Sequence, residues 1–326
     1  MLSGPRTPPE THGATVDHVL FLLFCAIAGS SFILMKKAAL AFGPVTIAAL
    51  RCLCASLVLL GLWRWMSPPR RPTRREAPWI VVLAVLGYAY PFAMVPYLVS
   101  RHGSGFIGMM VCFVPLITVL ISMPLLGVFP TRGQLVGVLG GLACITVILL
   151  DGVERSVPPL HLALAVSVTL CFAYTNVTTR QHLSELSPYL LTLLCVALVA
   201  LTLTPVGLVL EPVDLGSPFG LAVASLLALG VISTAVGLVI FFRVLQRRGP
   251  LYAGMVTYLI PLGALLWGWA DGEQVTTRQI AALLGVLAMV AIVQLDLARR
   301  DSRTDKGTHG SREGRSGVDA ITGNAR

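Results

Sequence analysis

The sequence has little charge inside its apolar stretches and lacks the short motifs of common soluble enzymes. Charged residues make up 12% of the 326 positions, and no Asp or Glu stands in the middle of a long apolar stretch. A Walker A sequence, an HExxH pair and an Asp-rich metal motif are all missing. These absences disfavour ATP-driven pumping and metalloenzyme chemistry. They also leave a proton relay based on a buried carboxylate without an obvious position.

The seven cysteines form neither a CxxC pair nor a cluster with histidine. Disulfide bonds and zinc sites are therefore not expected. We interpret the cysteines as small packing residues of apolar helices. Together with the missing motifs, this predicts a chain with no cofactor and no metal.

The chain instead contains many long apolar segments. Its mean hydropathy is +0.82, and apolar blocks follow one another from about residue 18 to about residue 297. A helix needs about 20 residues to cross the hydrocarbon core of a bilayer. We therefore predict an all-α integral membrane protein with ten transmembrane helices, at residues 18–38, 44–65, 79–99, 104–127, 133–150, 160–180, 188–210, 218–243, 250–270 and 278–297.

The net charge is +9, and the placement of the basic residues indicates an orientation. If the N-terminus is inside, the basic loop 67–78 and the basic tail 299–326 face inward, whereas outer loops carry acids such as Asp151 and Asp271. Lys and Arg in short loops mark the cytoplasmic side. We predict a multi-pass protein of the cell inner (plasma) membrane with both termini cytoplasmic. The same rule explains the basic loops, so the expected partner is the lipid bilayer and no nucleic acid.

The chain contains an internal repeat. Residues 101–116, RHGSGFIGMMVCFVPL, share Arg, Gly, Met, Pro and Leu positions with residues 247–262, RRGPLYAGMVTYLIPL, at a constant offset of 146 residues. Each half holds five predicted helices, and because five is odd the second half enters the membrane from the opposite side. Two inverted five-helix repeats are the architecture of secondary transporters. The predicted units are a disordered tail (1–16), a first repeat (17–151), a second repeat (152–298) and a basic disordered tail (299–326).

Four stretches, in order and spacing, resemble the drug/metabolite transporter (DMT) superfamily in its branch with two EamA domains. They are GSSFILMKKAALAFGPVTIAALR (29–51), GMMVCFVPLITVL (108–120), LGVISTAVGLVIFFRVLQRRG (229–249) and LIPLGALLWGWADGEQVTTRQIAALLG (259–285). The resemblance covers roughly residues 18–297. It implies a permease for small organic solutes such as amino acids, their analogues, other metabolites or drugs, often in the direction of export. The first half departs from the pattern, because it has Leu126-Gly127-Val128 where the second half has Gly272-Glu273.

Arg51 is the first candidate for substrate binding, because charge inside a bilayer is costly and is usually functional. It lies about seven residues, or roughly 10 Å, into the second predicted span. Its guanidinium could hold a substrate carboxylate with two hydrogen bonds. The alternative is a structural arginine bonded to helix-end carbonyls or to a partner helix, and the sequence favours that alternative.

Lys36 is the second candidate. It matches Arg180 at the 144-residue offset that also relates Pro44 to Pro188. A cation near each mouth of one pathway suits a small-molecule substrate that is anionic or zwitterionic. The alternatives are snorkelling of Lys36 to the outer interface and a cytoplasmic anchor at Arg180, and the anchor is favoured.

Polar and aromatic residues inside the spans complete the candidate set for substrate binding. An interfacial aromatic belt and ordinary packing explain at least half of them. The set is Tyr88, Tyr90, Tyr174, Asn176, Tyr258 and Trp267. Helix bends along the pathway, near the axis that relates the halves, are predicted at Gly108, Pro115, Gly254 and Pro261.

The sequence thus predicts a secondary transporter that moves a small polar organic metabolite by alternating access, with export preferred on resemblance alone. Rival hypotheses are a membrane enzyme acting on a lipid, for which no nucleophile or acid–base pair is found, and a scaffold without transport. Small-residue spacing at Gly137/Gly141 and Ala281/Gly285 predicts a tight pair of the fifth and tenth helices. A pair within one chain is favoured over a pair between two, and the protein is expected to be a monomer or homodimer.

Overall fold

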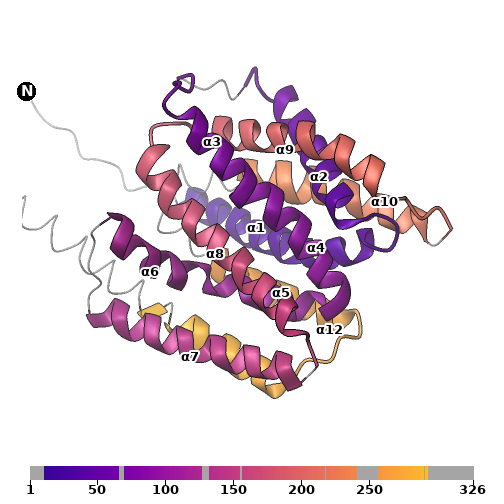
Figure 1. The fold of residues 1–326 in the computed structure, drawn as a ribbon. Coiled ribbons are helices and arrows are strands. Elements are labelled where there is room, and N and C mark those ends of the chain that lie inside the picture. Colours follow the sequence, from indigo (N-terminus) through magenta and orange to yellow (C-terminus); the bar gives the residue numbers. More distant parts are fainter. Residues whose placement is uncertain are drawn as a thin grey trace, which may run out of the picture.

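The computed structural model describes residues 11–65, 70–126, 132–154, 156–216, 218–240, 256–289 and 291–292, and every regular element within these ranges is a helix (Figure 1). The prediction of an all-α chain is confirmed for these residues. The elements are α1 (Thr11–Ala38), α2 (Pro44–Gly61), α3 (Ala77–Leu83), η1 (Ala84–Ala89), α4 (Tyr90–His102), α5 (Ser104–Met110), η2 (Val111–Phe113), α6 (Val114–Leu126), α7 (Arg132–Glu154), α8 (Pro159–His182), α9 (Pro188–Leu210), α10 (Phe219–Leu227), η3 (Ala228–Val236) and α12 (Val256–Ala270).

Seven described helical segments are long and apolar enough to cross a membrane. They are Val19–Ala38, Pro44–Gly61, Ala77–His102, Leu135–Gly152, Pro159–His182, Pro188–Leu210 and Phe219–Ile240. Three shorter apolar helices, Leu116–Leu125, Leu259–Ala270 and Thr277–Met289, overlap the remaining predicted spans.

The outer surface of these helices is apolar. In each of the seven segments no more than 50% of the most apolar window is buried inside the protein. Large side chains such as Leu201, Val209 and Trp269 point outward with 77%, 80% and 69% of their surface exposed. A soluble monomer rarely exposes apolar patches of this extent. The chain is therefore a multi-pass membrane protein whose outward side chains face lipid.

Among the described helices, α2 and α9 form the most extensive contact between the halves, and they run antiparallel. They start at Pro44 and Pro188, 144 residues apart, each with proline in the first turn, where its missing N–H costs nothing. Thr46 at the start of α2 meets Gly207 near the end of α9, and the Tyr189 hydroxyl at the start of α9 donates to the carbonyl of Leu59 near the end of α2.

Two π-helical segments lie at matching places in the halves. η1 begins at Ala84 and η3 at Ala228, again 144 residues apart. η1 of the first half packs on α9 of the second half, and η3 of the second half packs on α2 of the first half. The two contacts are therefore equivalent under the relation between the halves. Directly after η1, the N–H of Tyr90 donates to the carbonyl of Val85, five residues back, and the next residue is Pro91, which has no N–H. Such widened turns are frequent at functional sites.

The helix that follows α4 is interrupted between two of the predicted bend residues, Gly108 and Pro115. α5 gives way to the 3-10 segment η2, and α6 then continues. Because Pro115 has no N–H to offer the carbonyl of Val111, that carbonyl instead accepts from the N–H of Val114. The tighter turn at Val111 borders the cavity described below.

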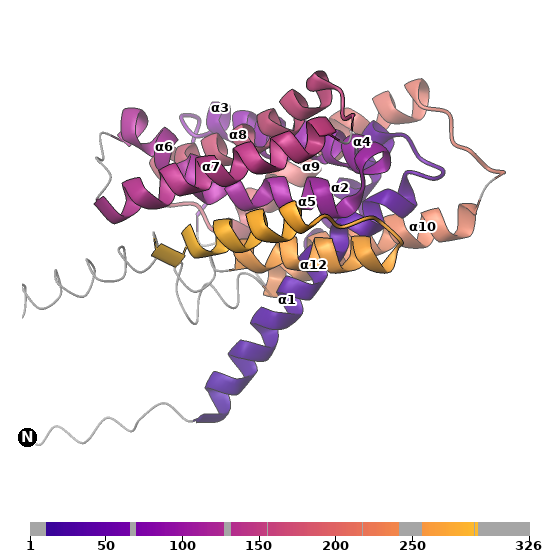
Figure 2. The same ribbon diagram turned by 90° about the horizontal axis from the view of Figure 1, so that it is seen from below.

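Small residues let helices approach closely at two further places. A Cβ on Gly29 of α1 would lie 2.8 Å from Cα of Gly263 in α12. α7 lies beside the helix Thr277–Met289, and Figure 2 shows the two running together. There Gly140 faces Met289 and Gly285 faces Cys144, so the predicted pair of helices meets within one chain. Gly141 faces Leu116 of α6 instead, because it lies on another side of α7. The monomer or homodimer state stays a prediction.

Candidate functional site

A cavity of about 230 Å³ lies between the two halves of the chain. One water needs roughly 10–15 Å³ of such space, so the cavity has room for a small organic solute. The first half contributes residues of α1, α2, η1, α4 and η2, and the second half contributes residues of α8, η3 and α12. Its aromatic wall consists of Phe24, Phe32, Tyr88, Phe92 and Phe172, and its small polar and charged side chains are Ser31, Arg51, Ser233 and Thr234.

Arg51 lies at the wall of this cavity with only 7% of its surface exposed. Its Nε donates to the hydroxyl of Thr234 at 2.8 Å. Its guanidinium carbon lies 4.0 Å from the centre of the Phe92 ring, within the range of a cation–π contact. Thr234 in turn donates to the carbonyl of Leu229, five residues back in η3, at 2.8 Å. The widened turn of η3 therefore fixes the hydroxyl that orients Arg51.

Two described residues of the cavity wall each have one buried polar atom without a hydrogen-bond partner. Within the described ranges, Nη1 of Arg51 and Oγ of Ser233 have no hydrogen-bond partner. The same part of the chain offers Arg51 no carboxylate within ion-pair distance. A buried charge without a partner costs several kcal/mol. Such an arrangement is suited to a ligand that brings hydrogen-bond acceptors and negative charge.

The structure places the predicted aromatic candidates at different sites. Tyr88 lies in the cavity wall, and its hydroxyl is 3.5 Å from the hydroxyl of Thr192 in α9. Tyr90 instead turns its hydroxyl to Ser167 of α8, at 2.5 Å. Tyr174 on α8 is half-buried. Of this group, Tyr88 is the residue that the structure brings next to Arg51.

The other candidates lie elsewhere. Asn176 is exposed on α8, and Trp267 on α12 is 48% exposed, as expected for residues that face lipid or headgroups. Tyr258 belongs to α12, and its side chain lies outside the described part of the structure. Gly254 also lies outside the described residues.

Two of the predicted bend residues, Gly108 and Pro261, are buried. Gly108 of α5 packs against Ala264 of α12 and the ring of Phe32 of α1. Pro261 is buried inside α12. Gly108 therefore lies in the contact between α5, α12 and α1, and neither residue faces the lipid surface.

Sequence reasoning did not single out Ser31, Ser233 and Thr234. A signal existed, because each is a hydroxyl side chain in an otherwise apolar span and lies in a stretch that carries the family resemblance. Phe92 and Phe172 gave no such signal, since apolar residues fill every span. Their role depends on how the helices pack.

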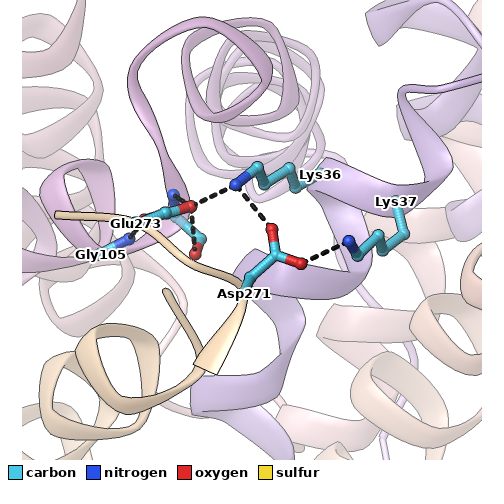
Figure 3. A network of polar contacts seen from close by, with 6 residues as sticks. Lys36, Lys37, Gly105, Asp271 and Glu273 are labelled. Atoms are coloured by element: carbon cyan, nitrogen blue, oxygen red, sulfur yellow. Dashed lines mark hydrogen bonds and ion pairs between the residues drawn. The ribbon is translucent and has the colours of Figure 1, made fainter. Parts of the chain in front are cut away.

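A polar network joins the end of α1 to the loop after α12 (Figure 3). Nζ of Lys36 lies 2.7 Å from Oδ2 of Asp271 and 2.7 Å from Oε1 of Glu273. Lys37 also pairs with Asp271. Met35, next to Lys36 in α1, lines the cavity. Both carboxylates lie in the loop after α12, so the network joins the first helix of one half to the second half.

Glu273 also binds the start of α5. Its Oε1 accepts from the N–H of Ser104 at 2.7 Å, and its Oε2 accepts from the N–H of Gly105 at 2.9 Å. The turn before α5 needs glycine, because Gly103 has φ of 91° and a Cβ there would lie 2.8 Å from Oε2 of Glu273. A negative group at a helix N-terminus is stabilising.

The network keeps its carboxylates ionised. Burial favours the neutral form, but the hydrogen bonds and charge of Lys36 outweigh it and hold the pKa of Glu273 below its usual value, with help from the backbone of Gly105 and Ser104. For Asp271, burial is outweighed in the same way by Lys36 and Lys37, and its pKa is also lowered. The ammonium of Lys36 is thus engaged by two carboxylates, and its contact with a substrate stays a prediction.

Among the described residues, no group of three or more His, Cys, Asp or Glu could hold a metal ion. His102, the last residue of α4, lies against His161 near the start of α8, and Nε2 of His102 is 2.7 Å from Nδ1 of His161.

Three comparisons with known proteins bear on this site. The family model described as "EamA-like transporter family" matches residues 17–150 and again residues 160–295. A solved structure titled "Crystal structure of protein" is 20% identical with a TM-score of 0.61, over 88% of this chain and 99% of that chain. At that identity the likeness shows the fold alone. No curated protein matches the chain.

Proposed function

The chain belongs to the EamA-like transporter family, and from this premise we propose that it moves a small polar organic solute across the membrane by alternating access, through the cavity at Arg51. Two EamA regions in tandem make it a member of the drug/metabolite transporter superfamily. Membership favours transport over the rival hypothesis of a lipid-modifying enzyme.

The observation that carries this proposal is the cavity itself. Its wall is made by both family-matched regions, and it contains a buried arginine whose Nη1 has no partner in the described part of the chain. Ligand sites of duplicated transporters lie between the repeats, near the middle of the membrane. If Arg51 only stabilised the fold through a salt bridge, a carboxylate would lie next to its guanidinium, and the described part of the chain places none there.

We propose ten spans in two inverted repeats. Seven helices are long enough by themselves, and the three shorter apolar helices supply the remaining crossings. The antiparallel contact of α2 with α9 supports inversion, because these helices occupy the same place in the two repeats. The exchange of packing partners between η1 and η3 supports it independently.

The proposed orientation places both termini in the cytoplasm of a cell with this protein in its inner (plasma) membrane, because the basic loops then lie inside. The Lys36 network then closes the outer end of the cavity. Alternating access requires these ion pairs to separate when the cavity opens outward. We propose export as the direction of transport, because the chain resembles a family whose members often export their solutes.

Transport by reconstituted protein tests the proposal. Vesicles containing the purified chain should take up some solutes of a labelled metabolite panel faster than empty vesicles, and a second series with an imposed proton gradient would show coupling. Arg75→Gln, in the exposed loop before α3, is the matched control and should transport like the native chain. Equal uptake by protein-containing and empty vesicles for the whole panel would overturn the proposal.

A further inference from the structure

We propose that the cavity selects an organic monoanion, namely one carboxylate on a compact apolar body about the size of an aromatic ring, over zwitterions, cations and neutral amides. This inference rests on the proposed function and names its substrate class. The charges, donors and walls of the cavity carry it.

The described wall of the cavity carries a single kind of charge. Among the described side chains that line it, Arg51 alone is charged. A single anionic group would neutralise this buried charge and offset its desolvation cost. A second negative charge would find no second cation in the described wall, which favours a monoanion over a dianion.

The hydrogen-bond donors of the cavity wall suit a carboxylate. Nε of Arg51 is already bonded to Thr234, and Phe92 covers one face of the guanidinium. The buried Nη1 and the hydroxyl of Ser233 are left without partners. Planar guanidinium donors match the two oxygens of a carboxylate. A carboxylate is therefore the group that would satisfy Nη1, with Ser233 as a second donor.

The described cavity wall offers no partner for a positive charge on the ligand. The described wall contains no carboxylate that could receive the ammonium of an amino acid. Burying an ammonium without a partner costs several kcal/mol. The rest of the wall is apolar, with Phe24, Phe32 and Phe172 among its side chains. A zwitterion or an amine is thus disfavoured, although a ring-sized apolar body fits.

Four ligands of similar shape and different charge test this inference. They are 3-phenylpropanoate (monoanion), 3-phenylpropanamide (neutral), phenylalanine (zwitterion) and 2-phenylethylamine (cation). Each is titrated against the purified full chain, and the rise in Tm with ligand concentration gives an apparent affinity. We expect the monoanion to bind about thirtyfold more tightly than the other three, as for a buried charge pair. Decanoate, as a fifth ligand, separates a fatty acid from a compact acid and should bind more weakly.

Substitutions of cavity residues test whether the cavity is the source of this selectivity. Arg51→Gln should bring the affinities for the acid and the amide close together, and Arg51→Lys should keep part of the difference. Ser233→Ala should weaken acid binding by about fivefold, as for one hydrogen bond, and it keeps the test sound if Arg51→Gln does not fold. Arg75→Gln, in an exposed loop, should bind like the native chain.

Equal or tighter binding of the amide, the zwitterion or the amine would overturn the inference, as would binding of none of the four. Retention of the full acid preference in Arg51→Gln would also overturn it. These outcomes leave the proposed function standing wherever vesicles still transport another solute of the metabolite panel, so the two failures are distinguishable.

Discussion

Lys36 and Glu273, 237 positions apart in the sequence, are joined by a contact of 2.7 Å between Nζ and Oε1. The same oxygen accepts from the N–H of Ser104. One carboxylate thus holds α1 of the first half and the start of α5 to the loop after α12. Loss of its charge should loosen this end of the bundle.

Glu273→Gln should open the cavity at this end more often. With Ser31, in the cavity wall, replaced by cysteine in a chain without its native cysteines, labelling by a membrane-impermeant reagent from the Lys36 side should be about fivefold faster, because a contribution of about 1 kcal/mol corresponds to that factor. Glu154→Gln, which removes the exposed pair with Arg278, is the matched control. Equal labelling rates in the two variants would argue against a closing role.

The pH dependence of stability should reveal the same network. Because the pKa values of Asp271 and Glu273 are lowered in the folded chain, their contribution is full above the usual carboxyl range, at about pH 4 to 4.5. It is lost as the pH falls through that range and below it. The Tm difference between the native chain and the Asp271→Asn/Glu273→Gln variant should be constant from neutral pH to mildly acidic pH and shrink only in strong acid. A difference that vanishes near pH 6 would contradict lowered pKa values.

Arg51 should matter for transport more than for folding. Arg51→Gln should reduce transport by about thirtyfold, as expected when one partner of a buried charge pair is removed, and Arg51→Lys should reduce it less, while both remain at the cell surface. Transport assays with quantified surface expression would test this. Loss of expression in both variants would instead support the structural interpretation of Arg51.

The proposed topology can be tested with two single cysteines. Ser156 lies at the end of the bundle where α7 finishes, and Arg74 lies in the exposed loop before α3. In intact cells, an impermeant thiol reagent should label Ser156→Cys and reach Arg74→Cys only after permeabilisation. Labelling of both from the same side would exclude the proposed arrangement.

Gly207→Ala should destabilise the contact between α2 and α9. A Cβ at this position would lie 2.9 Å from Oγ1 of Thr46 and 3.0 Å from its backbone nitrogen, so the helices must move apart. We expect a loss of about 1–3 kcal/mol, seen as a lower Tm. Gly220→Ala in α10, where a Cβ meets nothing within 4 Å, should be neutral or slightly stabilising. The same Tm for both variants would show that the close approach is not required.

The helices and the family could be predicted because their signals are local or repeated. Apolar length marked the spans, and the 144-residue relation of Pro44 to Pro188 marked the starts of two equivalent helices, α2 and α9, which pack against each other in the structure. Arg51 stood out because a charge inside an apolar stretch is rare. None of these signals depends on how one helix is rotated against its neighbours.

Which side chains line the cavity depends on how each helix is rotated and packed, and this could not be predicted from the sequence. Tyr88 and Tyr90 are two residues apart on a continuous helical segment, so their side chains point to nearly opposite sides. One therefore lines the cavity while the other faces α8. Ser233 and Thr234 gain their position from the π-helical turns of η3, which depend on contacts with α2 and carry no short-range signature.

The loop after α12 makes the two repeats chemically unequal, because only the second repeat carries a carboxylate there. A transporter made of two equivalent halves would have two end states of similar energy, since each state becomes the other when the halves exchange shapes. The first repeat has Leu126-Gly127-Val128 where the second has Gly272-Glu273, so the carboxylate that fastens Lys36 and Ser104 has no duplicate in the sequence. In the proposed alternating access, Glu273 therefore stabilises the state that is closed at the Lys36 end, and the matching position of the first repeat provides no carboxylate to stabilise the opposite state.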